Sequence, residues 1–326
     1  MNKVVLTDHL NKELALIRQI LKETDTELIA EDCGTEDETI DAAKDADVLM
    51  TANPRFYTPK MIGSLNKCKA VVIMSIGYDG MDIDALTKNG IMLINVPDYC
   101  LNEVADHALA LLLGMHRKVS ASDAKLREQL EYRPYQLRPI KGLSDTTVGI
   151  YGFGRIARRS AKRLSAFGCT IQFFDPYVDS DYDEDGVHAK KVSFEQMLRT
   201  SDDILMHAPA TKENYHIFND DAFALCERKP YVINVGRGEV MDENALCRAV
   251  TSGKVSGAAL DVHEYFNDFK ADDAIFNTPN IVLTPHCAWY SETSLNNMAR
   301  TVAEEINRVM RGQMPLSVVN KKELGL

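Results

Sequence analysis

The chain has 326 residues, of which 45% are hydrophobic and 26% charged, and its formal net charge is −11. This length predicts about two globular domains, and the composition is that of an ordinary soluble protein. The acidic balance argues against direct nucleic-acid binding, because phosphate contacts require clustered Lys and Arg.

Cysteine usage and the length of the apolar runs indicate the compartment. The seven cysteines are scattered, with no C-x-x-C pair, so neither a disulfide framework nor a metal site is expected. The amino terminus lacks the pattern of a signal peptide. Apolar runs such as 108–113 are far shorter than the roughly 20 residues that span a membrane. We therefore expect a cytoplasmic protein without a membrane partner.

Strands alternate with helices in the first hundred residues. Helical patterns are expected over 11–22 and 82–88, and apolar strands over 3–7, 48–51, 70–74 and 92–95. This alternation predicts a small α/β domain with a parallel, flavodoxin-like sheet. A long helix over 102–118 follows the last of these strands.

The most informative motif lies in the middle of the chain. A short apolar strand over 146–150 runs into a glycine turn at 152–154 and then into a helix, and the next strand, 170–174, ends at an aspartate. This is a G-x-G-x-x-A dinucleotide fingerprint with its acid about 20 residues further on. The pattern predicts an NAD site in a Rossmann domain, with the pyrophosphate at the new helix N-terminus. The contacts expected from this motif are Gly152, Phe153, Gly154, Arg155, Ile156 and Asp175.

Beyond the fingerprint the alternation resumes, with strands over 204–207, 231–235, 257–261 and 281–284 and a final helix over 291–311. Two long helices thus bracket the nucleotide module. We expect two doubly wound parallel-sheet domains, with a Rossmann domain of residues 100–290 inserted into a smaller domain of residues 1–99 and 291–326. Ligands should bind between them. The irregular, polar segment 118–145 could be a dimer arm or a plain surface loop.

Polar side chains follow the strands of the nucleotide module where each strand ends. Ligands sit at these carboxyl ends in open α/β sheets. Arg237 can hold a carboxylate bidentately, and His286 can exchange a proton near neutral pH. Beside a nicotinamide, this pair predicts hydride transfer at the carbon next to a carboxylate. The other strand-end residues expected at the cofactor are His207, Ala208, Pro209, Val235, Gly236 and Asp261.

Several separate motifs, from about residue 73 to residue 308, resemble the D-specific 2-hydroxyacid dehydrogenases. Residues 77–83 look like the family's substrate-carboxylate loop, and 234–238 look like its arginine signature, with Gly236 where alanine is usual. The segments 258–264 and 284–292 are similar to the C-terminal binding proteins. Those are NAD(H)-binding transcriptional corepressors built on the same fold.

The resemblance implies a role for each matched residue. Arg237 and His286 become the substrate-carboxylate anchor and the acid/base, and both also border the cofactor. Asp261 is assigned to the nicotinamide carboxamide. Trp289 is placed beside the substrate side chain, which favours apolar or thioether 2-oxoacids over glyoxylate. The substrate contacts implied are Ile76, Gly77, Tyr78, Arg237 and Trp289.

One position departs from the family pattern. The glutamate that pairs with the catalytic histidine is replaced by Phe266, and the nearest acids are Glu264 and Asp268. Either acid could reach His286, or the histidine works without a carboxylate partner. We therefore list Glu264 as a weak catalytic candidate only.

The sequence is interpreted as an NAD-dependent D-2-hydroxyacid dehydrogenase that forms a homodimer and acts on a small 2-oxoacid or 2-hydroxyacid. The alternative is an NAD(H)-gated regulatory protein of the corepressor kind with little turnover. Asp175 and the acidic residues of 179–185 predict NAD in preference to NADP, because they would repel a 2′-phosphate.

Overall fold

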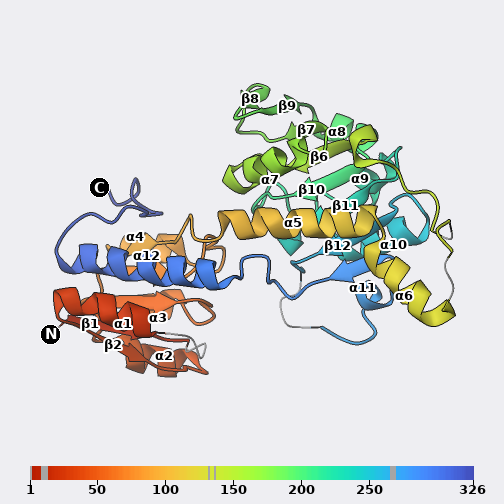
Figure 1. Ribbon diagram of the computed structural model, residues 1–326. Helices are drawn as coiled ribbons and strands as arrows, with labels where there is room; N and C mark the ends of the chain where they lie inside the picture. Colours follow the sequence, from red (N-terminus) through yellow and green to blue (C-terminus); the bar gives the residue numbers. More distant parts are fainter. Residues whose placement is uncertain (1, 9–13, 131–132, 136, 265–268) are drawn as a thin grey trace. The chain divides into compact units, whose positions relative to one another are not determined.

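The computed structural model describes residues 2–8, 14–130, 133–135, 137–264 and 269–326 (Figure 1). The chain divides into two compact units: residues 1–99 with 291–326 form the smaller one, and residues 100–290 form the larger one. Within the ranges described, no helix combines the length and the apolar character needed to cross a membrane.

The smaller unit is built on a parallel five-stranded sheet in the order β2-β1-β3-β4-β5. This is the order of flavodoxin-like sheets, as the sequence predicts. Its strands are β1 (Asn2–Leu6), β2 (Thr26–Ala30), β3 (Val48–Thr51), β4 (Ala70–Ile73) and β5 (Met92–Ile94). Strand β2 was not predicted, because Glu27 interrupts its short apolar run.

Two groups of helices accompany this sheet. Helix α1 (Ala15–Leu21) packs against α12 (Glu292–Met310), which returns from the far end of the chain (Figure 1). Helix α3 (Pro59–Gly63) contacts both α2 (Glu36–Ala43) and α4 (Ile83–Lys88). Helix α1 covers the described part of the helix expected over 11–22, and residues 9–13 lie outside the part described.

The larger unit contains an eight-stranded sheet in the order β13-β12-β11-β10-β6-β7-β9-β8. Every pairing is parallel except that of the edge strand β8 with β9. The chain first forms β6 and β7, and then crosses back to β10 on the other side of β6. That reversal is the Rossmann switch point, where ligands bind. The strands are β6 (Thr147–Tyr151), β7 (Thr170–Phe174), β8 (Tyr182–Glu184), β9 (Val187–Lys191), β10 (Asp203–Met206), β11 (Tyr231–Asn234), β12 (Gly257–Leu260) and β13 (Ile281–Leu283).

Helices pack along this sheet and bury its apolar strands. Helix α5 (Leu101–His116) contacts β10, β11 and β12 and lies beside α7 (Arg155–Ser165) (Figure 1). Helix α8 (Phe194–Thr200) packs on β6 and β7. Three short helices continue the series, in which α10 contacts its two neighbours: α9 (Asp220–Ala224), α10 (Glu243–Thr251) and α11 (Ala274–Asn277).

The segment that the sequence left as irregular contains a helix, α6 (Val119–Gln129). None of its residues is buried, so it carries no apolar stripe, and periodicity could not reveal it.

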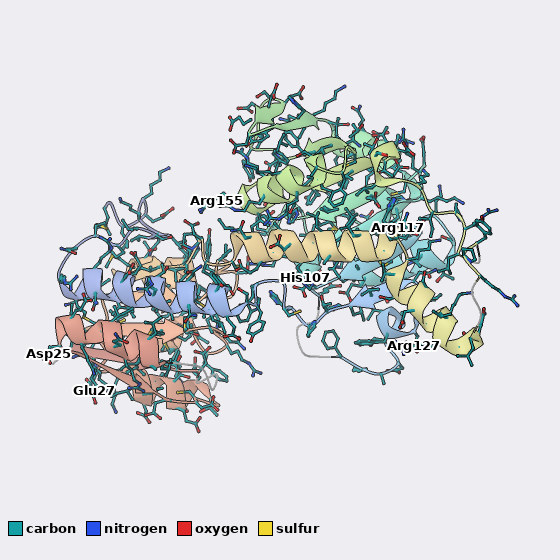
Figure 2. The ribbon with its side chains drawn as sticks, viewed as in Figure 1. Asp25, Glu27, His107, Arg117, Arg127 and Arg155 are labelled. Atoms are coloured by element: carbon teal, nitrogen blue, oxygen red, sulfur yellow. The ribbon has the colours of Figure 1, made fainter. Side chains whose placement is uncertain are left out.

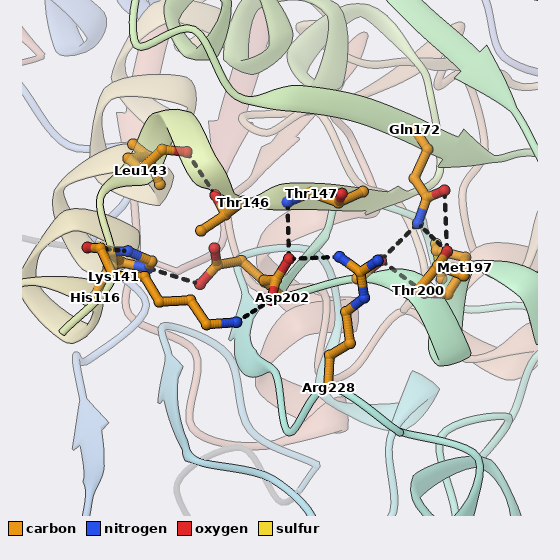
Figure 3. Close-up of polar contacts among 12 residues, drawn as sticks. His116, Lys141, Leu143, Thr146, Thr147, Gln172, Met197, Thr200, Asp202 and Arg228 are labelled. Carbon is orange, nitrogen blue, oxygen red and sulfur yellow. Dashed lines mark hydrogen bonds and ion pairs between the residues drawn. The ribbon is translucent and has the colours of Figure 1, made fainter. Parts of the chain in front are cut away.

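A polar network closes the amino-terminal edge of the larger sheet (Figure 3). The buried carboxylate of Asp202 accepts hydrogen bonds from Lys141 Nζ at 2.7 Å, Thr147 N at 3.0 Å and Arg228 at 3.0 Å. Beside it, His116 Nδ1 lies 3.3 Å from Asp203 Oδ1, and its Nε2 lies 3.2 Å from the Lys141 carbonyl oxygen. These bonds attach the segment that follows α6 to the sheet.

Asp202 is expected to stabilise the fold above mildly acidic pH. Burial alone would raise the pKa of Asp202, but the bonds from Lys141, Thr147 and Arg228 outweigh burial and hold it below its ordinary value. A lowered pKa means that the stabilisation is present above the unfolded-state pKa and is lost as the pH falls through the folded value. Asp202→Asn should therefore lower the free energy of unfolding by about 2 kcal/mol at pH 7, and the deficit should shrink toward pH 3.

Urea unfolding followed by circular dichroism measures both effects. The matched control is Asp220→Asn, since Asp220 forms a pair with Arg248 in which both side chains are more than half exposed. Equal losses in the two variants would contradict a special role for Asp202.

Candidate functional site

The fingerprint turn after β6 combines a close backbone approach with open space. Gly152 adopts φ +82°, which L side chains rarely take, and a Cβ there would lie 2.8 Å from Ala208. A Cβ at Gly154, by contrast, would meet no atom within 4 Å. The first glycine therefore permits the tight turn, and the second leaves room for a ligand against the backbone.

Helix α7 begins directly after this open position. Gly154 is its N-cap residue and supplies no side-chain hydrogen bond to the first turn. The first turn starts at Arg155 (Figure 2) and Ile156, and the backbone N–H groups of a first helical turn point toward the helix N-terminus. An uncapped N-terminus of an eleven-residue helix suits the pyrophosphate of a dinucleotide.

Asp175, at the end of β7, is fixed beside the same turn. Its carboxylate accepts the Phe153 N–H at 2.7 Å and the Tyr177 N–H at 2.8 Å, one on each oxygen. The residue is buried. Each oxygen retains a further acceptor lone pair, so the carboxylate can bind ribose hydroxyls while it holds the turn.

The ends of β10 and β11 meet the fingerprint at the switch point. The His207 N–H donates to the Tyr151 carbonyl at 2.9 Å. Among the residues described, buried His207 Nε2 has no hydrogen-bond partner, and burial lowers the pKa of His207 to about 4. The imidazole is therefore neutral at pH 7 and offers one polar atom to a ligand. Ala208 follows it, and Pro209 comes next in the chain.

Arg237 follows β11 on a turn that Asn234 closes. The Asn234 side chain accepts from Gly236 N at 3.0 Å and donates to the Arg237 carbonyl at 2.9 Å. The Arg237 guanidinium donates to the Gly236 carbonyl at 2.8 Å and is partly exposed. Val235 is buried at the strand end.

Asp261, at the end of β12, holds the turn that carries His286. Its oxygen Oδ1 accepts from Thr284 Oγ1 at 2.6 Å and from Cys287 N at 2.9 Å, and Oδ2 accepts from Ala288 N at 2.9 Å. The side chain is 1% exposed. Three donors of one turn thus bind a single buried carboxylate. Within the same turn, the His286 N–H donates to the Thr284 carbonyl at 3.0 Å.

His286 itself lies in the left-handed region, with φ +51°. The residue is exposed at one side, yet the protein atoms around its ring lower the pKa of His286 by desolvation. The carboxylate of Asp261 opposes this lowering, and Arg237 and His263 add to it. Arg237 therefore lies close enough to act on His286 electrostatically.

The weak candidate Glu264 contacts other groups. Its carboxylate accepts from His216 Nε2 at 2.7 Å and from the Tyr215 hydroxyl at 3.1 Å. The Tyr215 ring stacks on His216 at 4.0 Å. Phe266 and Asp268 lie outside the described residues.

The expected substrate residues fall in both units. In the smaller unit, Asn95 donates to the Ile76 carbonyl at 2.8 Å and Ser75 donates to the Gly77 carbonyl at 2.5 Å. In a trans peptide the N–H points opposite to the carbonyl, so the N–H groups of Gly77 and Tyr78 face the other way. In the larger unit, the Trp289 ring meets Tyr290 edge-on at 5.8 Å.

Residue spacing does not single out His107, although the structure brings it to this turn. His107 on α5 (Figure 2) places Nε2 3.1 Å from Thr284 Oγ1 and 3.5 Å from Asp261 Oδ1. His107, Asp261 and Cys287 each bring one possible metal-ligand atom within 4.8 Å of the others. However, Asp261 Oδ1 already accepts from Thr284 Oγ1 and Cys287 N, so we treat the group as a hydrogen-bond network. No sequence signal shows which strand end α5 faces.

The chain is similar in sequence and structure to several known proteins. Residues 109–288 match the profile of the D-isomer specific 2-hydroxyacid dehydrogenase NAD binding domain. The chain is 33% identical to the glyoxylate reductase of Thermococcus litoralis over 294 residues, which cover 87% of each chain. A D-lactate dehydrogenase from Aquifex aeolicus, solved with NAD and lactic acid, has a TM-score of 0.83 at 26% identity and covers 95% of this chain and 96% of its own. An acyclic imino acid reductase, solved with NADPH and D-Arg, has a TM-score of 0.86 at 26% identity and covers 98% and 100%.

Gly236 is expected to be required by its surroundings, although alanine is usual at this position of the arginine signature. A Cβ at Gly236 would lie 2.7 Å from the Ala208 carbonyl oxygen, closer than real contacts allow. Gly236→Ala should displace the end of β10, lower the free energy of unfolding by about 1–3 kcal/mol and weaken NADH binding. Urea unfolding and fluorescence titration measure the two effects.

Gly114→Ala on α5 is the control, since its Cβ would meet no atom within 4 Å and should stabilise the helix. If both alanine variants gained stability and bound NADH equally well, the inferred clash would be wrong.

Proposed function

This chain belongs to the D-isomer-specific 2-hydroxyacid dehydrogenase family, and we propose that it interconverts a small 2-oxoacid and the corresponding D-2-hydroxyacid. It is an NAD-dependent oxidoreductase of two parallel-sheet α/β domains. The proposal depends on one observation: Arg237 and His286 follow strands of one sheet at the same edge, close enough for the arginine charge to affect the pKa of His286.

In the proposed reaction, each group has one task. NADH, when bound, supplies the hydride that the carbonyl carbon of the 2-oxoacid accepts. Arg237 would hold the substrate carboxylate bidentately, since a guanidinium stays charged at every working pH. His286, as the imidazolium, would give its proton to the ketone oxygen, and in the reverse direction the neutral imidazole would take it back. The N–H groups of the loop 76–78 are the proposed second contact of the carboxylate.

The residues around the fingerprint fit a dinucleotide. Gly154 leaves open space, and α7 begins without a side-chain cap, so the pyrophosphate would lie there. Asp175 would bind the adenosine ribose, and its charge favours NAD over NADP. The unpartnered His207 Nε2, together with Val235 and the Asp261 strand end, would border the nicotinamide half.

Trp289 is the proposed wall of the substrate side-chain pocket. It follows the His286 turn closely, and a large aromatic ring offers apolar contact to a substituent on the 2-oxoacid. This assignment favours apolar or thioether substrates over glyoxylate. The regulatory alternative gains no support from the comparisons, in which the relatives are named as dehydrogenases and reductases.

A homodimer is the proposed assembly. Apolar side chains are exposed along 119–140, where Leu130 is 84% and Tyr135 68% exposed, and a second copy would cover them. A cytoplasmic location is proposed from the seven cysteines, all of which are free thiols.

Oxidation of NADH in the presence of a panel of 2-oxoacids tests the proposed function. We expect turnover with apolar 2-oxoacids, formation of the D-hydroxyacid and weaker use of NADPH. Arg237→Gln should reduce kcat/KM by at least about a hundredfold, because a desolvated charged contact contributes about 3 kcal/mol. Arg237→Lys should recover only part of this loss, since the bidentate geometry is missing. Absence of turnover with every 2-oxoacid, despite tight NADH binding, would favour the regulatory alternative.

The pH dependence of reduction should reflect the unusual surroundings of His286. Reduction needs the imidazolium, and desolvation lowers the pKa of His286, so the rate should fall as the pH rises through a value below that of free histidine. The family resemblance pairs position 266 with the catalytic histidine, so Phe266→Glu should raise the pKa of His286 and move the decline of the reduction rate upward by about one pH unit.

Glu264→Gln separates the remaining possibilities. Since Glu264 is hydrogen-bonded to His216 and Tyr215, we expect the pH at which the reduction rate declines to stay unchanged in this variant. A downward shift would instead identify Glu264 as the carboxylate partner of His286. If Phe266→Glu left the pH of this decline unchanged, an effect of a carboxylate at position 266 on the pKa of His286 would be ruled out.

A further inference from the structure

We propose that His107 is a positioning residue for His286 and that it acts through the Thr284 hydroxyl and the Asp261 carboxylate. The three side chains come from α5, the end of β13 and the end of β12. The part of this inference that concerns turnover rests on the proposed function, and the part that concerns the geometry and protonation of His286 does not.

The distances assign the direction of each hydrogen bond. Thr284 Oγ1 has one proton and lies 2.6 Å from Asp261 Oδ1, and an ionised carboxylate can only accept. Thr284 therefore donates to Asp261. Its oxygen, 3.1 Å from His107 Nε2, must then accept, so His107 carries a proton on Nε2. The chain of donors runs from His107 to Thr284 to Asp261.

The same carboxylate fixes the peptide groups next to His286. Asp261 accepts from the N–H groups of Cys287 and Ala288, the two residues that directly follow the histidine. Thr284 is thus bonded to Asp261 through its side chain, and to His286 through its carbonyl. A displacement of Thr284 or Asp261 therefore moves the backbone on both sides of His286.

The turn needs this support because His286 holds a backbone conformation that a non-glycine residue seldom adopts. Its φ of +51° lies in the left-handed region. Such conformations persist only where surrounding contacts determine them. His107 links this network to a helix, since α5 packs on β12 while Thr284 and Asp261 belong to strand ends.

The groups around this network determine how the pKa of His286 would change if the turn became mobile. His286 is influenced by desolvation first, then by Asp261, Arg237, His263 and Glu239, and the net effect lowers its pKa. His107 faces Thr284, Asp261 and the Cys287 thiol. If the turn became mobile, each influence on His286 would weaken, and its pKa would move upward toward that of free histidine.

The decisive comparison is His107→Leu against His107→Gln, because the glutamine amide retains an N–H donor near the position of Nε2. For His107→Leu we expect kcat for 2-oxoacid reduction to fall about tenfold, and the pH at which this rate declines to shift upward. His107→Gln should keep most of the wild-type kcat and the wild-type pH at which the rate declines. Thr284→Val should reproduce the leucine variant, and the double variant should be no worse than either single one.

Proton NMR titration of the His286 imidazole measures its pKa without turnover, and His286→Gln assigns the resonance. His116→Gln is the matched control: His116 lies on the same helix and is buried against Asp203, so its loss should lower stability without moving the His286 resonance.

Three outcomes would overturn the inference: equal His286 pKa values in wild type and His107→Leu, equal behaviour of the leucine and glutamine variants, or a shift in His116→Gln as large as in His107→Leu. If the wild-type protein reduces no 2-oxoacid, the proposed function fails, and the NMR titration still decides the role of His107.

Discussion

A buried carboxylate, that of Asp261, determines how the turn after β13 is arranged at the carboxyl edge of the larger sheet. An ionised carboxylate can remain in the interior only when hydrogen bonds replace its hydration. Here the donors are Thr284, Cys287 and Ala288. The need of the carboxylate at the end of β12 for hydrogen bonds therefore holds the turn that follows β13 in place. His286 lies inside that turn. The conformation of the proposed acid/base is therefore a consequence of satisfying a neighbouring buried charge.

Buried aspartates lie at both edges of the larger sheet, but the groups that bind their carboxylates differ. At the amino-terminal edge, Asp202 and Asp203 are paired with Lys141, Arg228 and His116, and these contacts attach a surface segment to the core. At the carboxyl edge, Asp261 is satisfied mainly by a turn that carries reactive groups. Helix α5 contributes a histidine to each edge, His107 and His116, so one rigid element links the stabilising edge to the site.

Departures from the family pattern have local physical reasons in this chain. Gly236 stands where alanine is usual, and the Ala208 carbonyl occupies the space that a methyl group would need. Glu264, an acid near the position of the missing glutamate, is bonded to His216 and Tyr215. Among the described residues that act on the pKa of His286, Asp261 and Glu239 raise it, and Arg237 and His263 lower it.

The sequence by itself determined the two parallel α/β sheets, because continuous apolar strands separated by helices and a glycine turn with its acid have few other folds. It also placed Arg237, His286 and Asp261 at strand ends, since parallel strands end at one edge. It missed the strands β2, β8 and β9 and the helix α6, which has no buried residue and so no apolar stripe. Only the tertiary structure showed that His107 reaches Thr284, that Glu264 contacts His216, and that Ala208 excludes a side chain at Gly236. These depend on how helices and turns pack on the sheet, and residue spacing along the chain does not encode which distant groups will meet.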